Sequence, residues 1–398
     1  MPIVSAELRW LTSGAAARWL ADEELQRLDA MAVANRLRRT LSAERVRLVS
    51  QQFELRRRAK TKFAAAQGMF FTPLGLEQAT DDAVARHKAK RFAAGKPVAD
   101  LCTGVGGDLR ALAARGPTLG VELDSAVAWL ANANLHVLGH ADSSVCVGDA
   151  TRLELRSAFA WHIDPDRRPD GHKTSQVEFG RPSGDELVAL LATNPNAAIK
   201  LSPAAAAPGT WEESGELEWV SRGGECRQQV AWLGALAGEP GRRRATLVDA
   251  RGETLRTVVG DDTAAAPVAQ QLGRYVYEPE AAVVAARLAG VLATEHSLEQ
   301  VAPQVAYFTG DAAISDAALA SFEVLAHLPC DRRRLRALCR ERGVGRIEVK
   351  KRGVDLDPAR LQAELSGSGE LAAVLLVYRR GSGAQAILAR RTGLPAGL

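Results

Sequence analysis

The chain of 398 residues contains no apolar run that approaches the roughly 18–20 residues needed for a membrane-spanning helix. Its first residues, MPIVSAELRWLTSGAAARWLADEE, carry acids where a signal peptide has an apolar stretch. Only five cysteines occur, and they are widely spaced without a CxxC pair, which argues against a zinc site or a disulfide framework. We therefore expect a cytoplasmic protein with reduced cysteines, no membrane association and no bound metal.

Internal repeats and long low-complexity tracts are also missing from the sequence. The composition, 46% hydrophobic and 25% charged, is that of an ordinary folded chain with two or three cores of about 100–200 residues each. The net charge of +4 is too small to identify a partner by itself. The location of the positive charge along the chain is therefore more informative than its total.

Three regions follow from the hydrophobic pattern. Residues 1–67 have helical spacing, with an N-cap expected at Ser42. Residues 68–309 form the predicted core, in which short apolar strands alternate with helices and so predict a doubly wound α/β sheet, followed by a β-rich segment near 204–300. Residues 310–398 form a small α/β domain that ends in two apolar runs, expected to be a hairpin.

A glycine-rich turn follows the first predicted strand, in the stretch DLCTGVGGD from Asp100 to Asp108. Its glycines, Gly104, Gly106 and Gly107, let the backbone turn tightly beside a ligand at the start of a helix. A dinucleotide site would have its third glycine later and would bind pyrophosphate where Asp108 stands. Because a carboxylate repels phosphate, acids on both sides of the turn favour S-adenosylmethionine, which carries a sulfonium and an ammonium group but no phosphate.

Further acids end the next two predicted strands. Glu122 follows Asp100 by 22 residues, where a carboxylate can accept hydrogen bonds from both ribose hydroxyls. Asp149 ends the third strand in VGDA, where it can meet the adenine. The predicted cofactor contacts are therefore Asp100, Gly104, Gly106, Asp108, Glu122 and Asp149.

These features resemble the class I S-adenosylmethionine-dependent methyltransferases, and within them the bacterial branch similar to trimethylguanosine synthase. The resemblance rests on FFTPLGLEQAT, DLCTGVGGDLRALA, GVELD, IDPDRR and IKLSP, and on a segment from Tyr307 that resembles the RNA-binding THUMP domain. It implies a Rossmann-like core around a mostly parallel seven-stranded sheet, with an N-terminal helical region and a C-terminal THUMP-like domain. It also implies that the segment from Thr72 to Thr80 lines the cofactor site, which adds Thr72 to the predicted contacts.

The stretch HIDPDRR departs from the acceptor site of related enzymes. Methyltransferases that modify exocyclic base amines commonly end the fourth strand in Asn/Asp-Pro-Pro-aromatic, but here Asp166 and Arg167 replace the second proline and the ring. Asp164 and Pro165 are still the predicted catalytic positions, with Asp164 orienting or deprotonating an acceptor. The chemistry of arginine predicts that Arg167 and Arg168 bind phosphate or pair with acids in a forked geometry. A strand-end ion pair between Asp164 and Arg167, without a catalytic task, is the alternative.

Positive charge is concentrated near the C-terminus. Between Asp331 and Arg352, ten cations outnumber three acids, an excess of seven. Leu335 and Leu338 give the helix an apolar stripe, so its arginines are expected on the exposed side. A merely solvated face is one interpretation. With the THUMP resemblance the pattern favours contact with an RNA backbone by Arg332, Arg333, Arg334, Arg336, Lys350 and Lys351.

The predicted function is methyl transfer from S-adenosylmethionine to RNA. Two alternatives stay open: a non-catalytic RNA-binding protein that keeps the cofactor pocket, suggested by the missing ring after Asp-Pro, and a methyltransferase that acts on a protein or a small molecule. We expect RNA as partner, S-adenosylmethionine as cofactor, and a monomer or a weak homo-oligomer.

Overall fold

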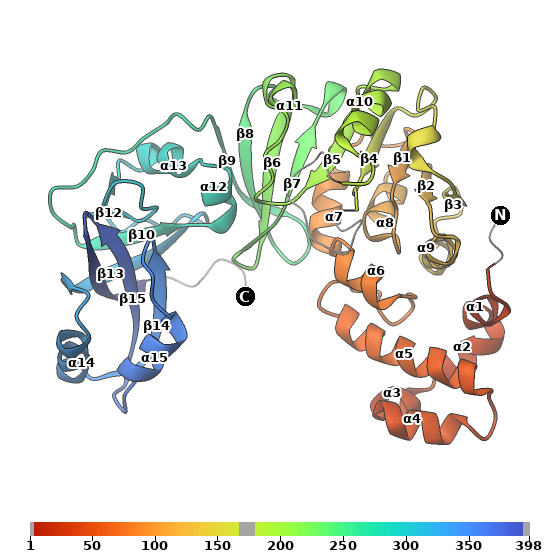
Figure 1. Cartoon of the computed structure of the whole chain (residues 1–398), viewed down its shortest axis with the longest axis horizontal. Helices are drawn as coiled ribbons and strands as arrows, with labels where there is room; N and C mark the ends of the chain where they lie inside the picture. The colour runs from red at the N-terminus through yellow and green to blue at the C-terminus, as the bar shows by residue number, and fades with distance from the viewer. Residues whose placement is uncertain (1–3, 167–179, 393–398) are drawn as a thin grey trace. The chain divides into compact units, whose positions relative to one another are not determined.

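The computed structural model describes residues 4–166 and 180–392, in which the chain forms two compact units (Figure 1). The first unit comprises Met1–Leu217, Gln228–Gly241 and Val248–Glu253. The second comprises Glu218–Arg227, Arg242–Leu247 and Thr254–Leu398.

Five helices open the first unit: α1 (Ala6–Leu11), α2 (Gly14–Leu20), α3 (Glu23–Arg27), α4 (Ala30–Leu37) and α5 (Ala43–Ala59). Side chains of Ser5, Asp22, Asp29 and Ser42 accept backbone N–H groups at the starts of α1, α3, α4 and α5, so the N-cap predicted at Ser42 is confirmed. The apolar faces of these helices pack into a cluster that also contains Leu130. The described part of the predicted N-terminal region, residues 4–67, is therefore packed within the first compact unit.

A nine-stranded sheet has the order β3-β2-β1-β4-β5-β7-β6-β8-β9. Its strands are β1 (Val98–Leu101), β2 (Thr118–Glu122), β3 (Ser144–Val147), β4 (Ala160–Ile163), β5 (Ala197–Leu201), β6 (Glu216–Arg222), β7 (Glu225–Trp232), β8 (Arg243–Val248) and β9 (Thr254–Gly260). The first five strands of this order are parallel, and β7 pairs antiparallel with β5. The α/β class is confirmed, but the predicted number of seven strands is wrong, because β8 and β9 extend the sheet beyond β6.

Helices join the parallel strands: α6 (Pro73–Gln78) and α7 (Asp82–Ala89) precede β1, and α8 (Gly107–Ala113), α9 (Ser125–Val137) and α10 (Gly184–Thr193) lie between later strands, with α11 (Gly209–Ser214) before β6. In the register, Leu101 of β1 lies opposite Val121 of β2 and Ile163 of β4. The carboxyl ends of these three strands therefore meet at one edge of the sheet, which is where open α/β sheets bind ligands.

The second unit contains a seven-stranded sheet of order β11-β12-β10-β13-β16-β15-β14. Its strands are β10 (Tyr275–Pro279), β11 (Glu299–Gln300), β12 (Phe308–Gly310), β13 (Leu319–Pro329), β14 (Val344–Arg352), β15 (Leu371–Arg380) and β16 (Gly383–Thr392), and its helices are α12 (Ala281–Ala285), α13 (Ala289–Glu295), α14 (Arg332–Glu341) and α15 (Pro358–Leu365). Strands β15 and β16 form the predicted antiparallel hairpin. Successive residues of β15, such as Leu375 and Leu376, pack into two different hydrophobic clusters, so both faces of the sheet are covered.

The second unit begins earlier than the boundary predicted at residue 310. Tyr275 of β10 pairs with Gly310 of β12 and with Glu323 of β13, so three strands that lie wholly or mostly before residue 310 belong to the C-terminal sheet. Hydrophobic spacing along the sequence shows that strands exist but not which strands they pair with. Strand pairing therefore places the start of the C-terminal sheet before residue 310, at β10.

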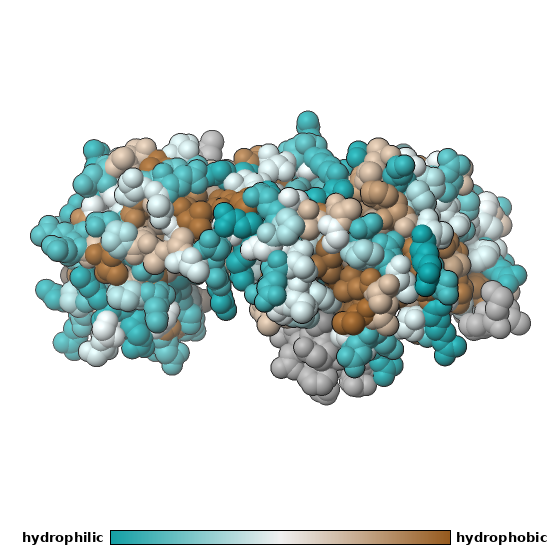
Figure 2. All heavy atoms as spheres, turned by 90° about the horizontal axis from the view of Figure 1, so that it is seen from above, coloured by the Kyte–Doolittle hydropathy of each residue, from teal (hydrophilic) through white to brown (hydrophobic). Residues whose placement is uncertain are grey.

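None of the helices in the described ranges, 4–166 and 180–392, has the length and apolar character needed to span a membrane. On the face drawn in Figure 2, hydrophobic residues are interrupted by hydrophilic ones. Such scattered apolar exposure is ordinary for a folded chain and does not identify a binding surface.

Candidate functional site

The glycine-rich turn joins β1 to α8. Gly104 and Gly106 have φ values of 57° and 89°, in the left-handed region that favours glycine, and Gly106 caps α8. A Cβ atom added to Gly104 would meet no heavy atom within 4 Å, so space is open beside this residue. A Cβ atom at Gly107 would lie 2.8 Å from the carbonyl oxygen of Thr80. Glycine at 107 therefore lets the first turn of α8 approach the backbone that precedes α7.

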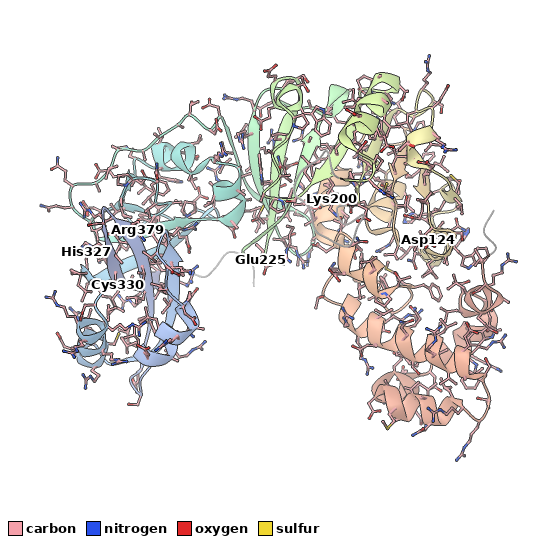
Figure 3. The ribbon with its side chains drawn as sticks, in the orientation of Figure 1. Asp124, Lys200, Glu225, His327, Cys330 and Arg379 are labelled. Atoms are coloured by element: carbon pink, nitrogen blue, oxygen red, sulfur yellow. The ribbon has the colours of Figure 1, made fainter. Side chains whose placement is uncertain are left out.

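Glu122 lies beside this turn. Its Oε2 accepts a hydrogen bond from the backbone N–H of Gly104 at 2.9 Å, and its Oε1 accepts one from the N–H of Asp124, which Figure 3 labels, at 3.0 Å. Each carboxylate oxygen can accept a second hydrogen bond. The partly exposed Glu122 carboxylate therefore combines a fixed position with remaining acceptor capacity.

Two other predicted cofactor contacts have local partners. Oδ1 of Asp149 accepts hydrogen bonds from the hydroxyl and the backbone N–H of Thr151, at 2.7 and 3.0 Å, and these bonds lower the pKa of Asp149. The hydroxyl of Thr72 accepts a hydrogen bond from the N–H of Gly75 at 2.9 Å and caps α6. A Cβ atom at Gly75 would lie 2.5 Å from Cγ1 of Val105, so α6 packs directly on the turn. Cofactor contacts by Thr72 and Asp149 stay predictions.

Behind the turn, two acids are joined by basic side chains in the interior. Oδ1 of Asp100 lies 2.7 Å from Nδ1 of His162, and Nε2 of His162 lies 3.1 Å from Nζ of Lys88. The same ammonium group lies 2.7 Å from Oδ1 of Asp108. Because an ammonium group only donates hydrogen bonds, Nε2 of His162 is the acceptor from Lys88 and Nδ1 carries the proton that is donated to Asp100.

The chain of contacts continues to the end of β4. The Thr80 hydroxyl donates to Oδ2 of Asp108 at 2.7 Å and accepts from Nζ of Lys200 at 3.0 Å. Lys200, which Figure 3 labels, also donates to Oδ2 of Asp164 at 2.5 Å. We call this set of seven residues the polar network: Asp100, His162, Lys88, Asp108, Thr80, Lys200 and Asp164.

Burial controls the charges in the polar network. Burial lowers the pKa of Lys88 and raises that of Asp100. It would also raise the pKa of Asp108, but the neighbouring positive charge, that of Lys88 foremost, outweighs it and holds this pKa well below its usual range. Asp108 is therefore an ionised carboxylate, with the Lys88 ammonium group beside Oδ1 and the Thr80 hydroxyl donating to Oδ2. A direct contact between Asp108 and a cofactor stays a prediction.

Sequence reasoning did not select His162 or Lys88 as site residues. His162 lies in β4, whose four residues are all buried. Lys88 lies on α7, one helical turn after the buried Val84, and the buried Phe92 follows shortly after the helix ends. A lysine on an apolar helical stripe and a histidine inside a central strand were the available signals.

The residues around the turn fit S-adenosylmethionine. Oδ2 of Asp100 is buried and has no hydrogen-bond partner in the described part of the chain, so it can accept from an ammonium group. Burial raises the pKa of the Cys102 thiol, and the negative charges of Glu122, Asp164 and Asp100 raise it further. These carboxylates therefore make the surroundings of the turn negative, which suits a sulfonium ion, while Glu122 suits the ribose hydroxyls.

The predicted acceptor residues lie at the end of β4. The Asp164 side chain is 24% exposed, the most exposed of the charged members of the polar network, whereas Pro165 is buried. The backbone of Asp166 forms two hydrogen bonds with that of Arg181, at 2.8 and 2.9 Å. The ion pair expected between Asp164 and residue 167 is not tested, because Arg167 and Arg168 lie outside the described residues, but Lys200 already pairs with Asp164.

The predicted basic surface of the second unit is only partly free. Arg332 and Arg336 of α14 both pair with Glu364 of α15, at 3.2 and 3.1 Å. Arg333 and Arg334 on the same helix are exposed and have no ion pair among the described residues. Arg340, near the end of α14, is also exposed without an ion pair in the described part of the chain, but its Nε donates to the carbonyl oxygen of Arg336 at 3.4 Å.

The lysines of β14 also have partners. Nζ of Lys350 lies 2.6 Å from Oε2 of Glu278 and is partly buried, and Nζ of Lys351 donates to the carbonyl oxygen of Leu356 at 2.8 Å. Arg352 contacts the same Glu278 at 3.3 Å. The strand therefore presents less unpaired charge than its sequence suggests.

One group of side chains has the composition of a metal site. Ligand atoms of Glu295, His296 and Asp316 lie within 4.8 Å of one another. Arg256 contacts both acids, with Nε 3.2 Å from Oδ2 of Asp316. Burial would raise the pKa of Asp316, but its hydrogen bonds with Ala318, His296 and Arg256 lower it overall. A guanidinium group thus supplies the positive charge that a metal would bring.

Known proteins match this chain over most of its length. An uncharacterized S-adenosylmethionine-dependent methyltransferase, present in two strains of Mycobacterium tuberculosis, is 33% identical over 340 residues, which cover 83% of this chain and 91% of the relative. A crystal structure from Porphyromonas gingivalis W83, provisionally named a methyltransferase, covers 99% of this chain and 100% of its own, with a TM-score of 0.80 and 20% identity, and so supports the fold.

The family described as THUMP domain-like matches residues 319–391, within the predicted C-terminal domain. The glycine-rich turn, the carboxylates around it and the 33% identity to the relative all point to the same family. The chain belongs to the S-adenosylmethionine-dependent methyltransferases, and S-adenosylmethionine is its cofactor.

Proposed function

We propose that this methyltransferase acts on RNA. The observation that carries the proposal is the exposed pair Arg333 and Arg334 on α14, inside the segment that matches the THUMP domain-like family. Arginines without internal partners are available to phosphate groups, and binding to a nucleic-acid backbone depends chiefly on such contacts. Contacts by Arg332, Arg336, Lys350 and Lys351 belong to the same proposal, although these four side chains have internal partners.

In the proposed reaction, bound S-adenosylmethionine supplies an electrophilic methyl group. Asp100, Gly104 and Glu122 hold the cofactor at the carboxyl ends of β1 and β2. Asp164 accepts a hydrogen bond from the N–H or O–H group of the acceptor, which fixes the direction of the nucleophile's lone pair. Holding the two reactants in this orientation supplies most of the rate acceleration.

RNA binding is tested by comparing two double variants of α14. Replacing Arg333 and Arg334 with Ala should weaken binding of a labelled single-stranded RNA and reduce the slope of log affinity against log salt by up to about 1.4, at about 0.7 per lost phosphate contact. The matched control replaces Arg332 and Arg336, whose charges are shared with Glu364, and should change the slope less. Equal slopes in wild type and both variants would place RNA recognition elsewhere.

Methyl transfer is tested with methyl-labelled S-adenosylmethionine and total RNA from a strain that lacks the gene. Wild-type protein should label the RNA, and Asp164→Ala, which removes the hydrogen-bond acceptor, should not, while cofactor affinity stays within about twofold because Asp164 contacts the acceptor. Label in protein or small molecules but not in RNA would select the alternative substrate class.

A further inference from the structure

The ammonium group of Lys200 lies in the interior, between the cofactor site at the glycine-rich turn and the proposed acceptor site at Asp164. All five residues of β5 are buried, and the side chain of Lys200 is 8% exposed. A buried ammonium group is tolerated only when it is paired and hydrogen-bonded. Two of its three protons have partners: Oδ2 of Asp164 at 2.5 Å and the Thr80 hydroxyl at 3.0 Å.

The polarity of these hydrogen bonds fixes the position of Lys200. Thr80 has one hydroxyl proton, which it donates to Asp108, so its oxygen is left to accept from Lys200. Asp108 is in turn held by Lys88 on α7. The ammonium group is therefore anchored from the interior on one side and bonded to Asp164 on the other.

The ammonium group of Lys200 therefore balances the charge of the Asp164 carboxylate before an acceptor binds. Lys200 already donates to Oδ2, and Oδ1 accepts no hydrogen bond in the described part of the chain, so we assign the acceptor contact to Oδ1. A neutral N–H or O–H group gains a hydrogen bond to Oδ1. A cationic acceptor, such as a lysine side chain, would meet the Lys200 ammonium group within a few ångströms of the carboxylate that attracts it.

We propose that Lys200 is a positioning residue that orients Asp164 and makes the acceptor site selective for neutral hydrogen-bond donors, such as nucleobase N–H groups, over ammonium groups. This inference rests on the proposed acceptor role of Asp164. It names the chemistry of the acceptor atom, which the α14 arginines do not determine.

The contact itself is tested without turnover, by NMR of the whole protein with its lysine Nζ atoms labelled. A buried, hydrogen-bonded ammonium group exchanges its protons slowly, so Lys200 should give a resolved signal that Lys200→Arg removes and thereby assigns. Asp164→Asn should shift that signal, whereas Asp166→Asn, at the exposed neighbouring acid, should not. An unchanged chemical shift of the Lys200 signal in Asp164→Asn would overturn the proposal.

The functional step is tested by kinetics with labelled cofactor and the same RNA. Lys200→Met should lower kcat about 10- to 100-fold, as expected for loss of a charged hydrogen bond, with cofactor affinity within about twofold. Lys200→Arg should recover much of kcat, and Lys96→Met, at an exposed lysine, should behave as wild type.

Two kinetic outcomes oppose the proposal: unchanged kcat in Lys200→Met, or wild-type labelling of lysine side chains in place of RNA. Absence of any label in RNA with the NMR result as expected would refute the RNA assignment alone, because the contact between Lys200 and Asp164 would stand.

Discussion

Replacing Lys88 with Met should be among the most destabilising single changes in the first unit. The Lys88 side chain is 2% exposed, and its ammonium group faces Asp108 at 2.7 Å and His162 at 3.1 Å. Met has a similar length but no charge, so Asp108 would remain in the interior without its nearest cation. Breaking a buried ion pair by removing one partner costs about 3–5 kcal/mol. For a unit of this size each kcal/mol lowers the melting temperature by about 2–4 °C, which gives a loss of roughly 6–20 °C.

The pH dependence of this loss has a definite sign. In the wild type the pKa of Asp108 is lowered, so its contribution is present above the unfolded value of 3.8 and is lost only as the pH falls toward the lower folded value. In Lys88→Met, less positive charge opposes the effect of burial, so the pKa of Asp108 in the folded state rises. A raised pKa lets the variant regain stability as the pH falls. The difference in unfolding free energy between variant and wild type should therefore be largest at neutral pH and should shrink as the pH falls.

Thermal and urea unfolding of three variants provides the measurement. Lys88→Met with Asp108→Asn should be more stable than Lys88→Met alone, because the double variant carries no uncompensated carboxylate at 108. Lys90→Met, at the C-cap of the same helix, is the matched control. Its exposed ion pair with Glu253 is worth about 0–1 kcal/mol. A loss below about 1 kcal/mol in Lys88→Met, or no recovery in the double variant, would refute the reasoning.

Three further expectations follow from other contacts. Glu122→Ala should weaken S-adenosylmethionine binding by about 1–3 kcal/mol in calorimetry, whereas Ala at the exposed Glu154 should leave it unchanged, and equal affinities would remove Glu122 from the cofactor site. Gly107→Ala should cost about 1–3 kcal/mol in urea unfolding, because its Cβ atom would lie 2.8 Å from the Thr80 carbonyl oxygen; full stability would show that this backbone yields. Asp316→Asn should lower the melting temperature of the second unit at pH 7. Because the folded pKa of Asp316 is lowered, this difference should narrow as the pH falls below 3.8, and a constant difference would contradict the assigned hydrogen bonds.

The positions of the strand-end acids could be predicted from the sequence, but the buried contacts behind the glycine-rich turn could not. Strand-end acids such as Glu122 and Asp164 could be located because alternating strands and helices bring the carboxyl ends of parallel strands to one edge. Lys88 could not be assigned a partner, because its contacts with Asp108 and His162 join three elements that are distant in sequence. Pairing between such elements depends on tertiary packing, which residue spacing does not specify.

The charge of the C-terminal region shows the same limit. A run of cations is visible in the sequence, but the acids that neutralise Lys350 and Arg332, Glu278 and Glu364, lie 72 and 32 residues away. The helix and hairpin were predictable because their signals are local: the Asp331 cap of α14 and the two apolar runs around the turn at Gly381. The number of α14 arginines without an ion pair could not be predicted in this way, because it depends on acids that are distant in the sequence.

The pairing of β10 with β13 decides how the C-terminal unit can be cut out for separate study. The matched segment 319–391 contains only the four strands β13 to β16 of the seven-stranded sheet. A fragment limited to it would expose the edge of β13 that normally pairs with β10 and would leave Lys350 and Arg352 without Glu278. Unpaired edges recruit other chains into aggregates. A fragment that begins before Tyr275 keeps this edge covered and is the better candidate for expression.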